Sequence, residues 1–180
     1  MTDSPSSSAL DSVSDSSVLR VAIGADHRGM HTAELVRDTL IGLGYQANIV
    51  GTCEKGKCDY PEQAYLVGQE INAGHADRGV LICGTGIGMS IAANKVKGLR
   101  AALVHDELTA QLSRSHNDAN VLCLSADLLG ERLIDKIVEV WMGTEFEGGR
   151  HERRVHKITA IENGLDPRTV VDAQADAQNA

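Results

Sequence analysis

Short apolar runs alternate with amphipathic segments along the middle of this 180-residue chain. Five runs rich in Val, Ile, Leu and Ala predict buried strands at 19–24, 45–50, 79–83, 100–104 and 121–124. Apolar residues at helical spacing predict helices at 30–43, 61–73, 87–96, 106–115, 130–141 and 150–163. Strict alternation of strand and helix implies right-handed crossovers. We therefore expect a single α/β domain, a Rossmann-like doubly wound sheet of five mainly parallel strands flanked by helices.

The two ends of the chain differ from this pattern. Residues 1–18 contain eight Ser, three Asp and no Lys or Arg, which predicts a disordered leader. Residues 165–180 carry no defined apolar stripe and are expected to form a flexible tail. The folded domain should span 19–164. Because neither a secretory signal nor an apolar membrane span is evident, we expect a cytoplasmic protein.

Charge and cysteine content narrow the function further. The chain has 17 basic and 25 acidic residues and a formal net charge of −8. This balance argues against nucleic acid or an anionic membrane as a partner, so any bound anion must be held by a few placed cations. A cytoplasmic location favours free thiols over disulfides for the four cysteines, Cys53, Cys58, Cys83 and Cys123.

The sequence Cys-Gly-Thr-Gly-Ile-Gly at 83–88 follows the most apolar predicted strand and opens a helix. Three alternating glycines let backbone N–H groups converge on an anion near the positive end of that helix. The motif is not a Rossmann fingerprint, because Met89 replaces the last glycine. A helix start also stabilises a thiolate at Cys83, with the hydroxyl of Thr85 nearby. An inert cysteine before a tight turn explains the same residues.

Asp26, His27 and Arg28 follow the first predicted strand. Ligands of doubly wound sheets bind beyond the carboxyl ends of the strands, so these residues are candidates for a site. The alternative is a solvated turn in which Asp26 caps the next helix. His27 and His31 have a spacing that suits two metal ligands, but no third ligand accompanies them, and we expect no metal site.

Two more candidate groups lie near the end of the chain. His116 and Asn117 place a group that titrates near neutrality beside an amide, although they also make an ordinary helix end. Arg150 and Arg154 lie four residues apart at the start of the last helix, which suits a phosphate clamp or a solvated charged face.

These pieces together fit one reaction. A thiolate base, an imidazole, an anion-binding loop and two arginines are what deprotonation of a carbon beside a carbonyl requires, with a phosphate as an anchor. Aldose–ketose isomerisation of a sugar phosphate fits them without a metal or a cofactor.

Five motifs, in order, resemble those of the type B ribose 5-phosphate isomerases across residues 19–164. They are Gly-Ala-Asp-His-Arg-Gly at 24–29, Asp-Tyr-Pro at 59–61, Ile-Cys-Gly-Thr-Gly-Ile-Gly-Met-Ser-Ile-Ala-Ala-Asn-Lys at 82–95, Gln-Leu-Ser-Arg-Ser-His-Asn-Asp-Ala-Asn at 111–120 and Glu-Gly-Gly-Arg-His at 147–151. The resemblance implies interconversion of D-ribose 5-phosphate and D-ribulose 5-phosphate through a cis-enediolate, by a Rossmann-like subunit that forms dimers and often tetramers.

The resemblance also implies roles for individual residues. Cys83 matches the catalytic base, Thr85 its assisting hydroxyl, and His116 the residue that opens the furanose ring. The expected substrate-binding residues are Asp26, His27, Tyr60, Gly84, Gly86, Ile87, Gly88, Asn117, Arg150 and Arg154. In the family, His116, Asn117 and the arginines come from the neighbouring subunit, which implies a homodimer with a shared site.

Two other functions remain open at this point. Related enzymes isomerise allose 6-phosphate or galactose 6-phosphate, and the sequence leaves a six-carbon substrate possible for this chain too. A non-catalytic module that binds a sugar phosphate or nucleotide would explain the glycines and arginines, but not the placed Cys, Thr and His.

Overall fold

The computed structural model describes residues 18–51, 53 and 56–170. Most of the expected leader and residues 171–180 of the expected tail therefore lie outside the described residues. Every predicted strand and helix is present, with ends that differ by at most three residues. The strands are β1 (Arg20–Ala25), β2 (Gln46–Ile49), β3 (Arg78–Cys83), β4 (Ala101–Leu103) and β5 (Val121–Ser125). The helices are α1 (Met30–Gly42), α2 (Tyr60–Asn72), α3 (Ile87–Ala93), α4 (Glu107–Ser115), α5 (Glu131–Gly143), α6 (Arg150–Glu162) and a short 3-10 turn, η1 (Pro167–Thr169).

The five strands form one sheet in the order β2-β1-β3-β5-β4, and every pair is parallel. The expected doubly wound α/β fold is confirmed. The central strand β3 is buried at all six of its residues, as its continuous apolar run predicts. The strand order changes direction between β1 and β3, so the loops after these two strands diverge to opposite sides and leave a crevice between them.

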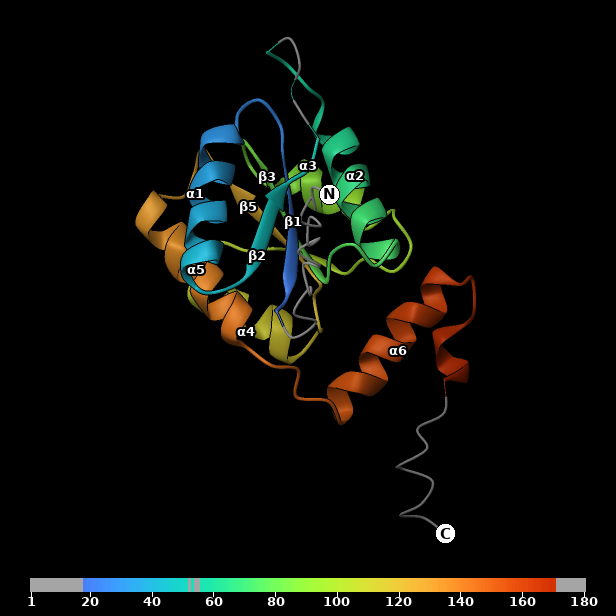
Figure 1. Ribbon diagram of the computed structural model, residues 1–180. Helices are drawn as coiled ribbons and strands as arrows, with labels where there is room; N and C mark the ends of the chain where they lie inside the picture. The colour runs from blue at the N-terminus through green and yellow to red at the C-terminus, as the bar shows by residue number, and fades with distance from the viewer. Residues whose placement is uncertain (1–17, 52, 54–55, 171–180) are drawn as a thin grey trace, which may run out of the picture.

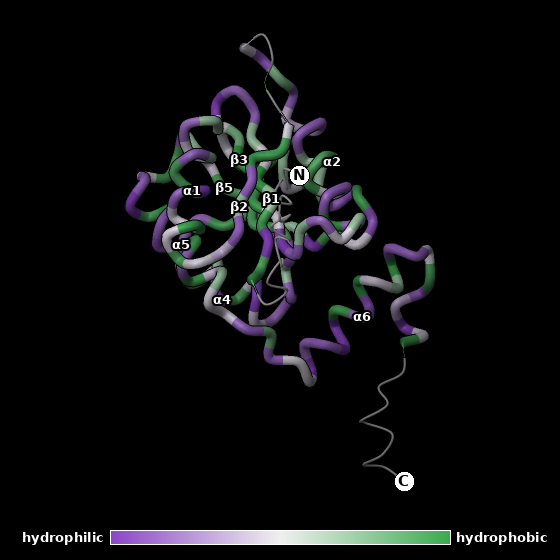
Figure 2. Tube along the Cα trace, in the orientation of Figure 1, coloured by the Kyte–Doolittle hydropathy of each residue, from purple (hydrophilic) through white to green (hydrophobic). Residues whose placement is uncertain are grey.

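Alternate side chains of the strands face two separate apolar layers. Val80 and Ile82 of β3 pack with α1, α4 and α5, whereas Leu81 and Cys83 pack with α2 and α3. The helices therefore cover both faces of the sheet, and the most apolar residues follow the strands (Figures 1 and 2). In the described part of the chain, no helix is long and apolar enough to cross a membrane.

Local side-chain contacts explain where α4 begins and where α3 ends. Asp106 begins α4 as its N-cap, because its carboxylate accepts a hydrogen bond of 2.7 Å from the N–H of Thr109. Helix α3 ends at Ala93, three residues before the expected end. Asn94 follows it and exchanges two hydrogen bonds with the backbone of Ala101, at 2.8 and 3.0 Å, which turns the chain into β4.

The cysteines correct one prediction. Cys53 and Cys58 are joined by a disulfide, whereas Cys83 and Cys123 are free and buried. The expectation of free thiols was therefore wrong for the first pair. The segment between β2 and α2 brings their Cα atoms to 5.1 Å, a separation that a disulfide spans.

Helix α6 extends away from the five-stranded sheet, and η1 folds back beside it (Figure 1). Part of the segment expected to be a flexible tail thus contains an ordered turn. The carboxylate of Asp166 accepts a hydrogen bond of 2.9 Å from the N–H of Arg168 and begins that turn.

We expect the core of the sheet to tolerate shortening poorly. Ile82 has no exposed surface, so Ile82→Ala should lower the free energy of unfolding by about 2–5 kcal/mol, and Ile82→Val by about 0.5–1.5 kcal/mol. Ile41 is 53% exposed, so Ile41→Ala serves as a control with an effect within about 0.5 kcal/mol. Urea denaturation measures all three. Equal effects of Ile82→Ala and Ile41→Ala would contradict this packing.

Candidate active site

Chemically active side chains gather first at the carboxyl ends of β1 and β3, on either side of the crevice between these strands. Asp26 and His27 come directly after β1, and Cys83 is the last residue of β3. The pairing of Ala25 with Ile82 places both loops at the same level of the sheet. Here parallel strands of an α/β sheet present their ligand-binding edge.

The thiol of Cys83 is buried beneath the glycine-rich loop. Cys83 is 5% exposed, and the N–H of Gly86 donates a hydrogen bond of 3.1 Å to its Sγ. A backbone donor of the glycine-rich loop thus points at the sulfur. Cys123 lies in the same apolar layer, where complete burial raises the pKa of its thiol far above the usual range.

The backbone of 83–88 forms a tight turn into α3. Gly86 precedes this helix with φ of 75°, a left-handed conformation that a residue with a side chain rarely adopts. The hydroxyl of Thr85 is exposed and accepts a bond of 3.4 Å from the N–H of Ile87. Gly84 lies under an ion pair between Arg28 and Asp127, with a nitrogen–oxygen distance of 2.7 Å, and a Cβ on Gly84 would require this pair to shift.

Asp26 holds the turn between β1 and α1 from a buried position. One of its carboxylate oxygens accepts hydrogen bonds from the N–H groups of Arg28 at 2.9 Å and Gly29 at 3.1 Å. Asp26 is 6% exposed, and the N-cap of α1 is Gly29, with no side-chain hydrogen bond to the helix. The alternative of a solvated turn with Asp26 as the helix cap was therefore wrong, and the carboxylate is fixed just after β1 by the turn that it holds.

His27 and Tyr60 complete this group. His27 is exposed and its Nδ1 donates to the carbonyl oxygen of Cys58 at 3.3 Å. Tyr60 is the first residue of α2, and its ring packs so closely on Gly88 that a Cβ there would lie 2.6 Å from it. Helix α2 therefore brings a phenol to the glycine-rich loop.

A second group of candidate residues lies at the opposite edge of the sheet. His116 ends α4 and, with Asn117, comes before the first residue of β5, Val121. The segment leading into α6 is attached there, because the N–H of Glu147 donates to the carbonyl oxygen of Ser115 at 3.0 Å. Arg150 is the first residue of α6 and is exposed, and Arg154 follows one turn later on the same face.

Within this group, two histidines share one carboxylate. The rings of His116 and His151 stack with centroids 4.0 Å apart, and their Nε2 atoms lie 3.8 and 3.7 Å from the same oxygen of Glu147. The Nε of Arg150 donates to Nε2 of His151 at 3.3 Å. Burial, then the charges of His116, Arg150 and Arg154, lower the pKa of His151, against the opposing charge of Glu147.

His116, Glu147 and His151 are also the one cluster among the described residues whose donor atoms are close enough for a shared metal. An imidazole nitrogen binds a metal at ~2 Å, along a lone pair in the plane of its ring. The two rings are within 10° of parallel and stacked, so no point at that distance lies in both planes. In this arrangement the two histidines cannot chelate one ion.

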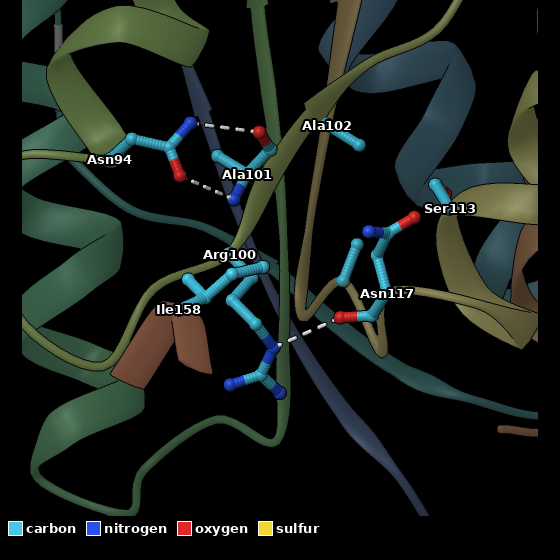
Figure 3. A pocket seen from close by; sticks show the side chains of 8 residues that line it. Asn94, Arg100, Ala101, Ala102, Ser113, Asn117 and Ile158 are labelled. Carbon is cyan, nitrogen blue, oxygen red and sulfur yellow. Dashed lines mark hydrogen bonds between the residues drawn. The ribbon is translucent and has the colours of Figure 1, made fainter. Parts of the chain in front are cut away.

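Asn117 also lines a cleft of about 200 Å³ beside the edge strand β4 (Figure 3). One side of this cleft is formed by Ile158 of α6. The other side is fixed by Arg100, whose Nε donates to the carbonyl oxygen of Asn117 at 3.2 Å. Asn117 is thereby held between the end of α4 and the start of β5.

A single chain keeps the two groups apart. β5 runs beside β3 from Val121, opposite Gly79, to Ser125, opposite Cys83. At ~3.3 Å per residue, this length alone separates the two edges by about 13 Å. Figure 1 shows the loop after β1 at the top of the molecule and the end of α4 and the start of α6 at the bottom.

Three residues at these two edges were not chosen from the sequence: Asp127, Glu147 and His151. Arg28 and Asp127 follow different strands, and only the sheet order brings them together over Gly84. Glu147 and His151 belong to a recognised motif, but a run of charged residues does not indicate which of them face each other.

Known proteins share this arrangement of sequence and fold. Residues 21–158 match the ribose/galactose isomerase family. The chain belongs to this family. The resemblance to its type B ribose 5-phosphate isomerases is likewise confirmed: the chain is 43% identical to ribose-5-phosphate isomerase B of Escherichia coli over 143 residues, which cover 79% of this chain and 96% of the relative.

Solved structures of the family have a similar fold and sequence. Ribose-5-phosphate isomerase B of Clostridium thermocellum is 43% identical and superimposes with a TM-score of 0.78, covering 81% of this chain and 99% of the other. The enzyme of Mycoplasma genitalium, solved with bound ribulose 5-phosphate, is 40% identical with a TM-score of 0.76, covering 81% and 97% of the two chains.

The lowered pKa of His151 should make the free energy of unfolding depend on pH. A ring with a pKa below its ordinary value of 6.5 binds its proton more readily in the unfolded chain. Stability should therefore fall as the pH drops below about 6.5 and level off below the folded-state pKa. We expect His151→Gln to flatten this slope in urea titrations between pH 5 and 7, with His156→Gln, on an exposed residue of the same helix, as the control. An unchanged slope in His151→Gln would contradict the assignment.

Proposed function

We propose that this chain interconverts D-ribose 5-phosphate and D-ribulose 5-phosphate through a cis-enediolate, without a cofactor, and that residues 19–164 form the isomerase domain. Family membership supports the reaction class, and the relatives named for ribose 5-phosphate support the substrate. The buried thiol beneath a glycine-rich turn supplies the group that such a reaction needs.

Cys83 is the base in this proposal. Its thiolate removes the proton from C2 of the open-chain sugar and returns it to C1, and the carbonyl oxygen becomes an enediolate oxygen in between. The backbone N–H groups of the turn stabilise that negative charge, with Gly84, Gly86, Ile87 and Gly88 lining the site. Thr85 places an exposed hydroxyl beside the reacting oxygens to carry protons between them.

The remaining residues bind and prepare the substrate. His27, Arg150 and Arg154 hold the phosphate, because all three are exposed groups that donate to an anion. Asp26, Tyr60 and Asn117 contact the sugar. His116 opens the furanose ring by moving a proton between the ring oxygen and the anomeric hydroxyl.

The proposal of a homodimer rests on the separation between the group around Cys83 and the group around His116. No motion inside one folded chain brings His116 and the arginines to Cys83, since the sheet itself lies between them. A second copy of the chain can supply them. We therefore propose a homodimer in which each site takes Cys83 from one subunit and His116 from the other, with tetramers as pairs of such dimers.

Complementation between inactive variants tests this shared site. Cys83→Ala and His116→Asn should each lower kcat on cyclic ribose 5-phosphate by about 10³-fold. Unfolding and refolding an equal mixture should restore about a quarter of the wild-type activity, because half of the dimers are mixed and each mixed dimer has one intact site. Recovery no greater than the sum of the two variants would place the whole site in one chain.

Substitution of Arg154 tests whether this residue binds the phosphate. Arg154→Ala should raise KM for ribose 5-phosphate by about tenfold or more and change kcat little, because the lost charge-assisted hydrogen bonds lie away from the reacting carbon. Arg132→Ala removes the same charge from an exposed position on α5 and should leave KM unchanged. Equal KM values in both variants would remove Arg154 from the site.

Substrate choice is measured by comparing ribose 5-phosphate with allose 6-phosphate and galactose 6-phosphate on protein treated with EDTA. We expect strong turnover of the five-carbon sugar. Preference for a six-carbon sugar would move the chain to the other branch of the family. Binding without turnover of any of the three would support a sensor module.

A further inference from the structure

The cysteines of the segment between β2 and α2 have no part in the proposed reaction. Cys53 and Cys58 are joined to each other and are half-buried, in contrast to the buried Cys83 and Cys123. The disulfide closes a short loop of sequence separation five. Because the entropic stabilisation from a disulfide grows with the length of the loop that it closes, this short loop gains little, and the main effect of the disulfide should be on local geometry.

Both sulfur atoms lie against the substrate-facing loop. The Sγ atoms of Cys53 and Cys58 are each 3.7 Å from the carbonyl oxygen of Ala25, the last residue of β1. Asp26 and His27 follow immediately. The carbonyl oxygen of Cys58 in turn accepts the hydrogen bond from Nδ1 of His27. The disulfide thus contacts the residue before Asp26 and fixes the backbone group that holds His27.

The hydrogen bond to Cys58 determines which way His27 presents its ring. A carbonyl oxygen only accepts, so Nδ1 carries the proton and Nε2 is the nitrogen left for a ligand. When the ring is protonated, Nε2 donates to a phosphate. Loss of the fixed carbonyl would leave the ring free to rotate, and binding would then have to order it again.

The Cys53–Cys58 disulfide also lies just before α2 in the chain. Cys58 is followed by Asp59, the N-cap of the helix, and by Tyr60, whose ring packs on Gly88. The disulfide therefore lies between two side chains of the site, His27 and Tyr60. Cys53 and Cys58 are only half-buried, unlike Cys83 and Cys123, and attack by a thiolate needs such access.

We propose that Cys53 and Cys58 form a reversible dithiol–disulfide site whose oxidised state orients His27 for phosphate binding. The inference rests on the proposed function for its effect on catalysis. The reaction partner is a dithiol reductant. Its thiolate attacks one sulfur, the S–S bond breaks, and a mixed disulfide forms. Its second thiol then releases the protein, so that Cys53 and Cys58 gain two electrons and two protons and the reductant leaves as a disulfide.

The first measurement establishes the chemistry without any assay of activity. In the denatured full-length chain, thiol titration should find two free thiols before treatment with a dithiol and four after it, since Cys83 and Cys123 are free in both states. Two-dimensional NMR of the folded protein, labelled with ¹⁵N in histidine, should show His27 as the Nδ1–H form when oxidised and as a mixture when reduced. Four thiols before treatment, or an unchanged His27 signal, would overturn the proposal.

The second measurement tests the effect on binding. Reduction should raise KM for ribose 5-phosphate by about fivefold, the effect of one lost hydrogen bond, with kcat unchanged. Cys53→Ser and Cys58→Ser should each show the higher KM in both conditions. If these variants respond to the dithiol as the wild type does, Cys83 is the sensitive thiol and the proposal fails.

Different results would refute the isomerase function and the dithiol–disulfide site. An oxidised wild type without turnover would refute the isomerase function, and the thiol count and the His27 signal would still decide the dithiol site. Normal turnover with the same KM in both redox states would refute the dithiol site alone.

Discussion

The parallel direction of the five strands is the constraint on which the rest of this structure depends. In such a sheet every loop after a strand lies at one edge and every loop before a strand lies at the other. Cys83 ends β3, whereas His116 precedes β5, so the thiol and the imidazole are fixed at opposite edges. The strands would have to separate for one chain to bring them together, which is why the proposed site draws on two copies of the chain.

At the edge where the strands begin, charged side chains add to the backbone hydrogen bonds that hold the loop before β5. Asp118, in a left-handed conformation with φ of 45°, pairs with Arg100 and Arg114 at 2.8 Å each. Arg114 is buried, and its guanidinium lies 5.7 Å from the ring of Trp141, while that of Arg78 lies 5.4 Å from the same ring. Burial and the charge of Arg114 lower the pKa of Arg78. This network fixes the backbone on either side of His116 and Asn117, so that both are presented in a defined position.

The fold could be predicted, and several candidate residues could be chosen, because their signals are local. The apolar run of β3, the three glycines after it and the spacing of Arg150 and Arg154 lie within short stretches of sequence. The partners of these residues could not be predicted in the same way. Arg28 meets Asp127 across 99 residues, and His116 stacks on His151 across 35. No periodicity encodes such contacts, because they depend on which strands become neighbours.

The sequence by itself determined the alternation of strands and helices, the buried central strand and the turn at 83–88, because hydrophobic period and glycine placement act within a few residues. The tertiary structure alone decided how these parts are used. It joined Cys53 to Cys58 beside Ala25, buried Asp26 in the turn before α1, and placed two imidazoles beside one carboxylate. The strand order also divided the candidate residues between two edges. The physical reason is that distances between remote segments are set by packing the whole sheet, and packing is a property of the folded chain.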